Sequence, residues 1–337
     1  MAALGVLNPT LLDIAKATDP SGKIGTIIEI LNETNEILTD MSWVEGNLAT
    51  GHRSMQRTGI PAPTWRKLGG GVLSTKATQA QITDDCGMLE AYAVIDKALA
   101  DLNGNTATYR LQQDRAFLEG MNQEVANTLF YGNSGLVPET FTGLSPRFST
   151  VVTATAASAE NVIDAGGTGT DNASIWLVVW GPDTCFGIIP KGSTAGFQMN
   201  NKGQVTVEDA SNGSNTGAME AYRTHYRWDV GLAVPDWRYV VRICNIDKSL
   251  VVKDAASGPD LPDLLFQAMN LIPNLGMGRP AIYLSRAMLT NLRRQTANLT
   301  KSSTLETAMV GGKMVTNFQG IPLRRCDALS ADEARVV

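Results

Sequence analysis

The sequence has 337 residues, of which 43% are hydrophobic and 18% charged, a balance typical of a globular protein with one or two cores. Its formal net charge of −5 and pI of about 5.2 argue against a protein whose main surface wraps nucleic acid, because neutralising phosphates requires a basic face. No apolar run approaches the length of a membrane span. The N-terminus lacks the basic stretch and apolar core of a signal peptide, so we expect synthesis in the cytoplasm.

The cysteines and histidines are scattered along the chain. They are Cys86, Cys185, Cys244, Cys326, His52 and His225. The cysteines form no Cys-x-x-Cys pair and the histidines have no neighbour at metal-ligand spacing. We therefore interpret the cysteines as reduced, mostly buried thiols, and expect neither a bound metal nor a cofactor.

The charges of the first hundred residues fall into blocks of opposite sign. Residues 1–45 contain seven acids and two lysines, a formal charge of −5. Residues 46–83 contain no acid and five cations, Arg53, Arg57, Arg66, Lys67 and Lys76, a formal charge of +5. Residues 84–104 contain five acids and one lysine, a formal charge of −4. Such blocks are either solvated faces or complementary surfaces that join neighbouring copies of a chain.

The basic block has the pattern of a two-stranded ribbon. Polar and apolar residues alternate over 64–68 and 72–83, on either side of three consecutive glycines at 69–71. Because an isolated hairpin with so few apolar residues is marginal in water, we expect the ribbon to need a partner surface. The acidic arm or the helical surface of the next subunit would supply it, in head-to-tail contacts that close a ring or shell.

Residues 105–131 form the longest predicted helix, with no proline and one internal glycine. Its predicted apolar stripe consists of Leu111, Leu118, Met121, Val125 and Leu129. Asn103 or Asn105 is the expected cap, and Gly132 with Asn133 is expected to end the helix in the left-handed conformation. Such a helix would act as a mechanical spine along which strands pack.

The remaining elements follow the spine in order. Residues 84–101 predict a strand or helix that leads into the spine, and the apolar run over 174–181 predicts a buried strand. Residues 230–243 predict two strands broken at Pro235 and Asp236, with Trp237 and Tyr239 in the second. We further expect a helix over 261–273, a strand over 281–285, a helix capped by Ser285, and two strands that turn at Gln319 and Gly320.

The motifs of common enzymes are absent from the sequence. The glycine-rich loop at 165–174 lacks the lysine of a phosphate-binding loop and precedes a strand instead of following one. The segment around Ser145 has Arg147 where a nucleophile elbow requires glycine. His225 has Asp229 four residues on, but its aromatic surroundings favour a packed or surface imidazole. Asp84 and Asp85 are adjacent and would point to opposite sides of a strand, which suits neither glycosidase chemistry nor a metal site.

Five segments resemble, in the same order, the major capsid proteins of tailed bacteriophages, which have the Hong Kong 97 fold. They are residues 1–24, 51–68 (GHRSMQRTGIPAPTWRKL), 115–133 (RAFLEGMNQEVANTLFYGN), 222–246 and 318–329. The resemblance covers nearly the whole chain. It implies an α+β capsid fold with an N-terminal arm at 1–45 and an extended loop at 46–83. It further implies a peripheral domain at 84–150 and 305–337, containing the spine helix, and an axial domain at 151–304.

The resemblance also implies a function. Proteins of this kind assemble as hexamers and pentamers of an icosahedral head shell that encloses double-stranded DNA, so the chain is expected to be a non-enzymatic virion protein assembled in the bacterial cytoplasm. Its expected partners are itself, a portal, a scaffolding protein and a cement or decoration protein, with weak non-specific DNA contact and no membrane. Scaffolding would be a separate protein or absent, because the recognisable arm begins at Met1.

Some relatives join subunits through a Lys–Asn isopeptide bond. Lys67 or Lys76 with Asn317 would be the candidates here, but no sequence feature selects them, and we expect shells without covalent links. The residues expected to make intersubunit contacts are Arg53, Arg57, Trp65, Arg66, Lys67 and Lys76. One alternative keeps the fold and makes the chain an encapsulin-like nanocompartment shell. The alternative of another class is a soluble hydrolase that uses His225.

Overall fold

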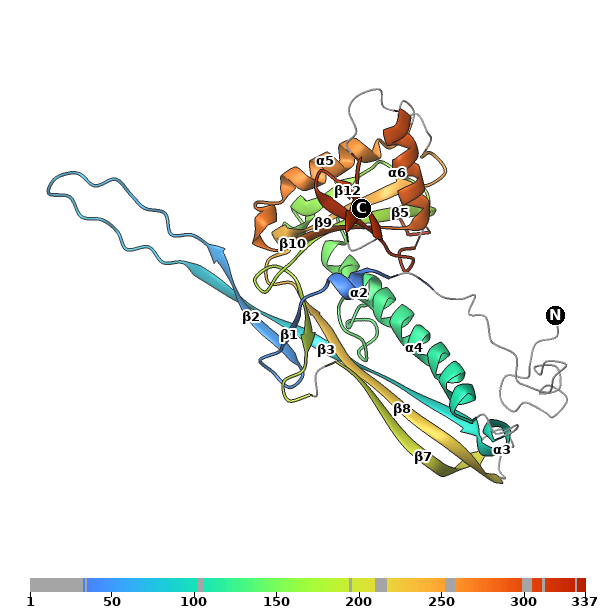
Figure 1. Cartoon of the computed structure of the whole chain (residues 1–337). Helices are drawn as coiled ribbons and strands as arrows, with labels where there is room; N and C mark the ends of the chain where they lie inside the picture. Colours follow the sequence, from blue (N-terminus) through green and yellow to red (C-terminus); the bar gives the residue numbers. More distant parts are fainter. Residues whose placement is uncertain are drawn as a thin grey trace. The chain divides into compact units, whose positions relative to one another are not determined.

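The structure, a computed structural model, describes residues 33, 35–101, 106–193, 196–209, 217–251, 258–298, 305–310, 313–330 and 332–337 (Figure 1). These residues belong to two compact units. The small unit contains Leu89–Asn122 and Phe197–Trp228, and the large unit contains Glu33–Met88, Gln123–Gly196 and Asp229–Val337. Both combine helix and strand, which confirms the expected α+β class. Most of the predicted N-terminal arm lies outside the described residues.

A seven-stranded sheet, counted over the described strands, forms the centre of the large unit. Its order is β11 (Leu305–Val310), β12 (Lys313–Phe318), β13 (Ile321–Arg325), β10 (Arg279–Leu284), β5 (Asn172–Trp180), β9 (Val240–Asp247) and β4 (Val162–Asp164). All nine residues of β5 are buried, which confirms the strand predicted from the apolar run. Antiparallel β9 and β10 flank β5, so the centre of the sheet is shielded from water on both edges.

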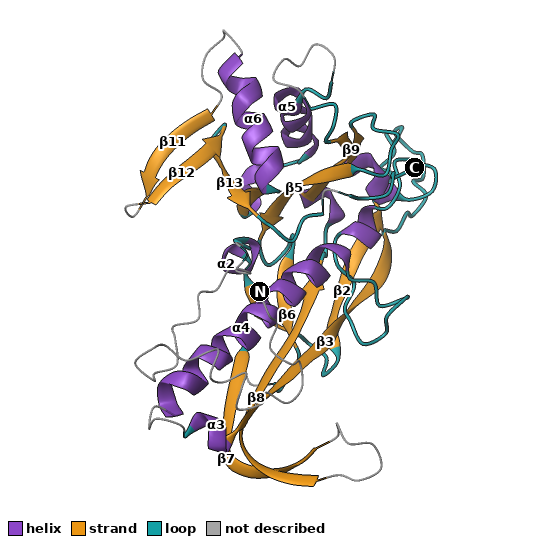
Figure 2. Cartoon of the chain, turned by 90° about the vertical axis from the view of Figure 1, so that its right-hand side faces the viewer, coloured by secondary structure: helices purple, strands orange, loops and turns teal. Residues whose placement is uncertain are grey.

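The two faces of β5 contribute to different parts of the core, because successive side chains of a strand point in opposite directions. Ile175 and Leu177 belong to the main apolar cluster, which includes residues of α5 (Leu261–Leu271) and α6 (Arg286–Asn298). Figure 2 shows these two helices next to the sheet. Trp176, which lies between Ile175 and Leu177 in β5, points to the opposite face. Its ring contacts those of Phe130 and Phe148, at centroid distances of 6.2 and 6.0 Å. The end of the spine helix is thus packed against the sheet.

Several predicted boundaries of the second half are confirmed. Ser285 caps α6, since its hydroxyl accepts a hydrogen bond from the backbone N–H of Met288 at 3.4 Å. Gln319 and Gly320 have φ angles of 50° and 80° and form the turn between β12 and β13. The sequence analysis did not predict β4 or β11, whose pairing with β9 and β12 stabilises short segments of weak pattern.

The second strand after Pro235 begins later than predicted. Trp237–Tyr239 forms a 3-10 turn and β9 begins at Val240. The Asp236 carboxylate accepts a hydrogen bond from the backbone N–H of Arg238 at 3.1 Å, and this cap favours a turn where alternation alone suggested a strand.

The spine helix α4 covers Thr106–Tyr131, as predicted except for Asn105, which lies with Asn103 outside the described residues. The predicted continuous apolar stripe is wrong in the first half of the helix. Met121, Val125 and Leu129 are buried, but Leu111 and Leu118 are 57% and 40% exposed among the described residues. The apolar residue that packs in that half is Phe117 instead.

The end of α4 also differs from the prediction. Neither Gly132 nor Asn133 has a positive φ. The Gly132 N–H donates to the Thr128 carbonyl at 2.8 Å, continuing the helical pattern for one residue. A Cβ atom at Gly132 would lie 2.5 Å from the Phe141 carbonyl oxygen. Glycine is therefore required here by a close backbone approach and not by a left-handed conformation.

The small unit contains the continuation of the spine and of two long strands. It comprises α3 (Lys97–Ala100), the first part of α4, β7 (Phe197–Asp209) and parts of β3 (Thr78–Asp96) and β8 (Gly217–Ala233). Antiparallel β7 and β8 pair over their whole common length. Ala93, Met121 and Tyr226 form its buried cluster, and the Tyr226 ring stacks on Phe117 of the helix. Aromatic packing therefore joins the helix to these strands.

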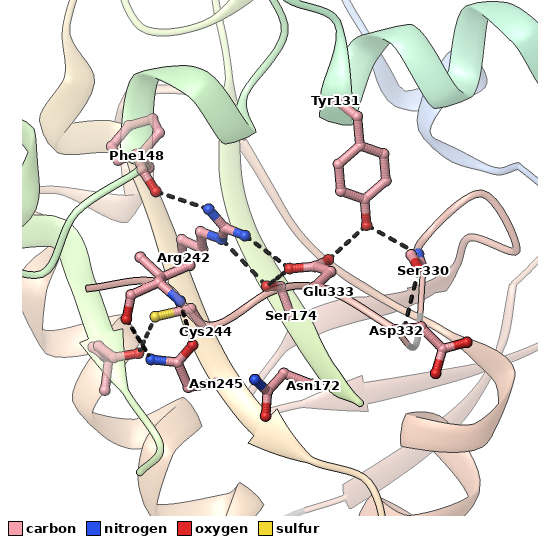
Figure 3. A network of polar contacts seen from close by, with 12 residues as sticks. Tyr131, Phe148, Asn172, Ser174, Arg242, Cys244, Asn245, Ser330, Asp332 and Glu333 are labelled. Atoms are coloured by element: carbon pink, nitrogen blue, oxygen red, sulfur yellow. Dashed lines mark hydrogen bonds and ion pairs between the residues drawn. The ribbon is translucent and has the colours of Figure 1, made fainter. Parts of the chain in front are cut away.

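A buried polar network fixes the C-terminal segment in the large unit (Figure 3). The Arg242 guanidinium donates to Glu333 at 2.7 Å and to the Phe148 carbonyl at 2.9 Å. Glu333 also accepts from the hydroxyls of Tyr131 at 2.6 Å and Ser174 at 2.5 Å. Arg242 and Glu333 are 4% and 7% exposed, so both charges are paired out of contact with water.

Candidate functional site

The predicted ribbon is present, but its strands are shorter and closer to its foot than the sequence suggested. Strand β2 (Gly51–Gly59) pairs antiparallel with β3 from Gly51 opposite Asp85 to Gly59 opposite Thr78. Residues 60–77 form neither helix nor strand, so the strands predicted over 64–68 and 72–77 are wrong. Pro61 and Pro63 lack the N–H groups that a ladder needs, and alternation of side chains cannot compensate for that loss. Figure 1 shows this loop projecting beyond β2 and β3.

The glycines predicted at the tip do form its turn. The Gly70 N–H donates to the Lys67 carbonyl at 3.1 Å, and Gly69 has a φ of 80°. A side chain at that φ is disfavoured, so the glycine is required by the turn. The chain thus reverses four residues after Trp65 and returns towards β3.

All six residues predicted to make intersubunit contacts are exposed. They are Arg53, Arg57, Trp65, Arg66, Lys67 and Lys76. The Trp65 side chain is fully exposed, as is Leu68, and the same loop exposes Ile60, Val72 and Leu73. Only Trp65 among these apolar residues was predicted. The others could have been found from their place near two prolines and three glycines, which oppose the regular pairing that would bury them.

The cations of the loop have no counterions in the described part of the chain. None of the five forms an ion pair with a described residue, and residues 46–83 contain no acid of their own. Arg53 differs from the rest because its side chain lies along the ribbon, with Nε 3.4 Å from the Thr83 hydroxyl. The remaining four extend from the ribbon without a described side-chain partner. A cluster of like charges next to exposed apolar groups is typical of a surface that a partner covers.

The foot of the ribbon is firmly attached to the large unit. The Asn47 amide donates to the Arg53 carbonyl and its oxygen accepts from the Arg53 N–H, both at 2.7 Å, which extends the ladder by one side chain. Asp84, opposite His52 on β3, is 3% exposed and forms an ion pair with Arg147 at 2.7 Å. Arg147 also donates to the Leu232 carbonyl at 3.2 Å. The anchored foot allows the loop to present its tip in a defined direction.

The other candidate sites have structural explanations. The His225 Nε2 lies 3.1 Å from the Glu90 carboxylate, and its ring stacks on Tyr92 at 4.5 Å. In the described part of the chain, the imidazole therefore contacts a carboxylate and an aromatic ring, not a hydroxyl or thiol nucleophile. Asp84 is buried and Asp85 exposed, as the alternation of a strand predicts. The glycine-rich loop precedes β5, and the Asn172 amide closes it by donating to the Gly169 carbonyl at 2.7 Å.

Metal-binding clusters and membrane-spanning helices are absent from the described residues. No group of three or more His, Cys, Asp or Glu side chains lies close enough to hold a metal ion there. In the same part of the chain, no helix combines the length and the apolar character needed to cross a membrane. The four cysteines are free, three of them buried and Cys86 half-buried.

Comparison with known proteins identifies the family. The sequence matches the family described as major capsid protein GP7 over residues 19–337. This chain belongs to that capsid protein family. A capsid protein of bacteriophage epsilon15 is 37% identical over the full length of both chains, with a TM-score of 0.74. The α+β fold of this capsid protein is therefore of the Hong Kong 97 type, and its function is that of a phage head shell protein, as the sequence predicted.

One more distant structure shares the fold. The capsid protein of bacteriophage JBD30 is 11% identical, covers 96% of this chain and 99% of its own, and has a TM-score of 0.50. An encapsulin of Synechococcus elongatus PCC 7942 is 9% identical with a TM-score of 0.45, over 72% and 97% of the two chains, too distant to support the nanocompartment alternative. No curated protein sequence is significantly similar to the chain.

Proposed function

We propose that this capsid protein assembles as hexamers and pentamers of an icosahedral shell through its extended loop, residues 46–83, which lies on a neighbouring copy. The observation that carries this proposal is the fully exposed Trp65 in a segment with five cations that have no described counterions. Exposed apolar groups in a loop contribute no stability to an isolated chain, whereas a partner surface would remove them from water. Head-to-tail contacts of this kind close into rings when the rotation between copies permits.

The remaining parts of the chain take the roles of the corresponding family segments. Residues 1–45 form the N-terminal arm, 84–150 and 305–337 the peripheral domain, and 151–304 the axial domain. The intersubunit contacts involve Arg53, Arg57, Trp65, Arg66, Lys67 and Lys76. Exposed ion pairs contribute about 0–1 kcal/mol each, so the burial of apolar groups and the number of copies supply most of the assembly energy.

The shell encloses double-stranded DNA with weak, non-specific contact, since the chain is acidic overall. The protein is made and assembled in the cytoplasm of the bacterial host, with a portal, a scaffolding protein and a cement protein as further partners. Lys67 and Lys76 are exposed and Asn317 is half-buried on β12. We propose that they form no isopeptide bond, so that denatured shells release monomers on a gel.

Charge reversal of the ribbon tests the proposed contacts. Replacing Arg53, Arg57 and Arg66 by Glu is expected to leave a folded, soluble chain that forms no shells in negative-stain electron microscopy. The matched control reverses three exposed arginines outside the loop and the spine helix, Arg279, Arg294 and Arg335, and changes the net charge equally. Normal shells from the ribbon variant, or equal loss in both variants, would contradict the role of the loop.

The contents of purified particles separate the alternatives. Particles from infected cells are expected to contain DNA by absorbance, whereas a nanocompartment would contain protein cargo. A hydrolase would be a small oligomer whose activity is lost in His225→Ala. Because His225 pairs with Glu90 on the surface of the small unit, that substitution is expected to leave shell formation intact.

A further inference from the structure

A groove of about 800 Å³ lies at the foot of the ribbon, within the large unit. Four parts of the chain line it: β2 with the first loop residue, Ala157, the turn at 182–186, and the turn at 235–238. Its apolar lining includes Met55, Ile60, Pro182, Phe186, Pro235 and Trp237. Met55 and Ile60 are 67% and 86% exposed. The groove therefore presents apolar surface to solvent, next to the loop proposed to join neighbouring copies.

The charge of the groove favours an aromatic occupant over a charged one. Two arginines, Arg57 and Arg238, and two acids, Asp183 and Asp236, line it, so the formal charge is zero. Arg238 and Asp236 already neutralise each other through an ion pair at 2.6 Å. Asp183 is exposed and has no hydrogen bond or ion pair with a described residue. A neutral apolar groove with one free acid at its rim fits an aromatic side chain followed by a cation.

The loop tip carries that combination, since Trp65 is followed directly by Arg66 and Lys67. Trp65 does not lie in the groove of its own chain, because the groove lining ends at Ile60 and Trp65 is fully exposed. Pro61 and Pro63 fix φ near −65° and hold the intervening segment extended, which opposes folding back. Five extended residues carry the chain roughly 17 Å beyond Ile60. Trp65 can therefore reach such a groove only on a second copy.

We propose that Trp65 of one copy occupies the foot groove of a neighbouring copy, with Arg66 next to Asp183 at the rim. The proposal rests on the loop-mediated assembly described above and names the surface that receives the loop. Each copy then offers a tip and a groove, and the pairing repeats head to tail around a ring. A buried tryptophan in a preformed pocket is a typical dominant anchor of an interface.

A double-mutant cycle on shell formation tests the pairing. Trp65→Ala removes the anchor, and Ala157→Trp fills the groove, since Ala157 is an exposed lining residue. Each is expected to lower the fraction of protein that sediments as shells at least about tenfold, the loss expected for an anchor residue. The double variant is expected to be no worse than the more damaging single variant, because both remove the same contact.

Matched controls separate this contact from general damage. Ala154→Trp places the same side chain on an exposed alanine that does not line the groove, and Leu136→Ala truncates an exposed leucine outside the loop. Both are expected to form shells at the wild-type level. Circular dichroism and thermal unfolding should be unchanged in all variants, since none of the four side chains is buried.

Cross-linking locates the tip directly. Arg66→Cys with Asp183→Cys retains Trp65, and a short bismaleimide is expected to link residue 66 of one copy to residue 183 of another in assembled particles. The single variants Arg66→Cys and Asp183→Cys, treated in the same way, measure the cross-linking that involves the four native cysteines. Shells that form normally from the Trp65→Ala variant, or assembled particles with no link between residues 66 and 183, would overturn the proposal while leaving the shell function intact. Absence of shells from the wild-type chain would instead contradict the proposed function itself.

Discussion

Arg242 and Glu333 join the central sheet to the C-terminal segment. The buried guanidinium of Arg242 donates a hydrogen bond to the buried carboxylate of Glu333, so each charge has the other as its counterion. Every oxygen of Glu333 has a donor, from Arg242, Ser174 and Tyr131. Burial raises the pKa of the Tyr131 hydroxyl, with the Glu333 charge adding to the effect, so this phenol remains a donor at neutral pH. A buried pair of this kind contributes little beyond an apolar pair of the same shape, but an unpaired member is costly.

Glu333→Leu is therefore expected to destabilise the subunit by about 3–5 kcal/mol, because Arg242 would stay buried without its counterion. The double variant Arg242→Met with Glu333→Leu should regain most of that loss. Urea unfolding of unassembled subunits measures both. An equal loss in the single and double variants would show that the geometry of the network, and not the unpaired charge, determines stability.

Cys86 illustrates how burial controls reactivity. Burial and the nearby carboxylates of Asp85, Asp229 and Asp84 raise the pKa of its thiol from 9.0 to about 12. At pH 8 its thiolate population is then roughly a thousandfold below that of an ordinary cysteine. Thiol reagents should modify the native chain slowly and all four cysteines rapidly after denaturation.

The same shift has a consequence for stability. Because the native pKa is raised, the unfolded chain loses its thiol proton first as pH increases. The contribution of Cys86 to stability is constant below pH 9 and is expected to fall as pH rises from 9 towards 12. Cys86→Ser should weaken this alkaline dependence in urea unfolding measured across that range; an unchanged dependence would assign it to other groups.

The spine helix is an element whose two glycines have opposite roles. Gly120 lies in the helix with no heavy atom within 4 Å of the position of an added Cβ. Gly132 follows the helix and an added Cβ there would lie 2.5 Å from one carbonyl oxygen and 2.6 Å from another. At position 120 glycine has only an entropic cost. At position 132 glycine is required, because a side chain would clash with the neighbouring backbone.

Gly120→Ala is thus expected to stabilise the chain by about 0.5–1 kcal/mol, as alanine reduces the freedom of the unfolded state. Gly132→Ala is expected to destabilise it by about 1–3 kcal/mol, because the segment around Phe141 must move. Thermal unfolding of the two variants beside wild type checks the pair. Similar shifts of the same sign would contradict the assignment.

At the scale of the whole molecule, the loop and the two units differ in what they need to fold. The large unit has its own buried sheet. Strands β2 and β3 pair with each other as far as Gly59 and Thr78, where the loop begins and ends. Residues 60–77 are nearly all exposed and contribute little to that core. We therefore expect that the subunit folds without this loop, whose proposed role is in assembly.

Replacing residues 60–77 by Asn-Gly tests this division, because a two-residue turn can join the paired ends at Gly59 and Thr78. The shortened chain is expected to be soluble, with a thermal midpoint close to wild type, and to form no shells in electron microscopy. Loss of folding would show that the loop stabilises the subunit. Shells of normal size would contradict its role in assembly.

The sequence by itself determined the elements whose pattern is local. The apolar run of β5, the length of α4, the cap at Ser285 and the turn at Gln319 follow from residues that are adjacent in the chain. The basic loop was also identified from its charge, its glycines and its few apolar residues, because such a segment has little of its own to bury. The family followed from the order of these segments.

Only the tertiary structure decided features that depend on distant segments. The sequence placed Leu111 and Leu118 in a buried stripe, but which face of α4 is covered depends on the strands packed against it. Gly132 is required by the distant Phe141, and the pairing of Glu333 with Arg242 joins residues far apart in the chain. The foot groove likewise combines four separate parts of the chain, so no local sequence pattern can predict it.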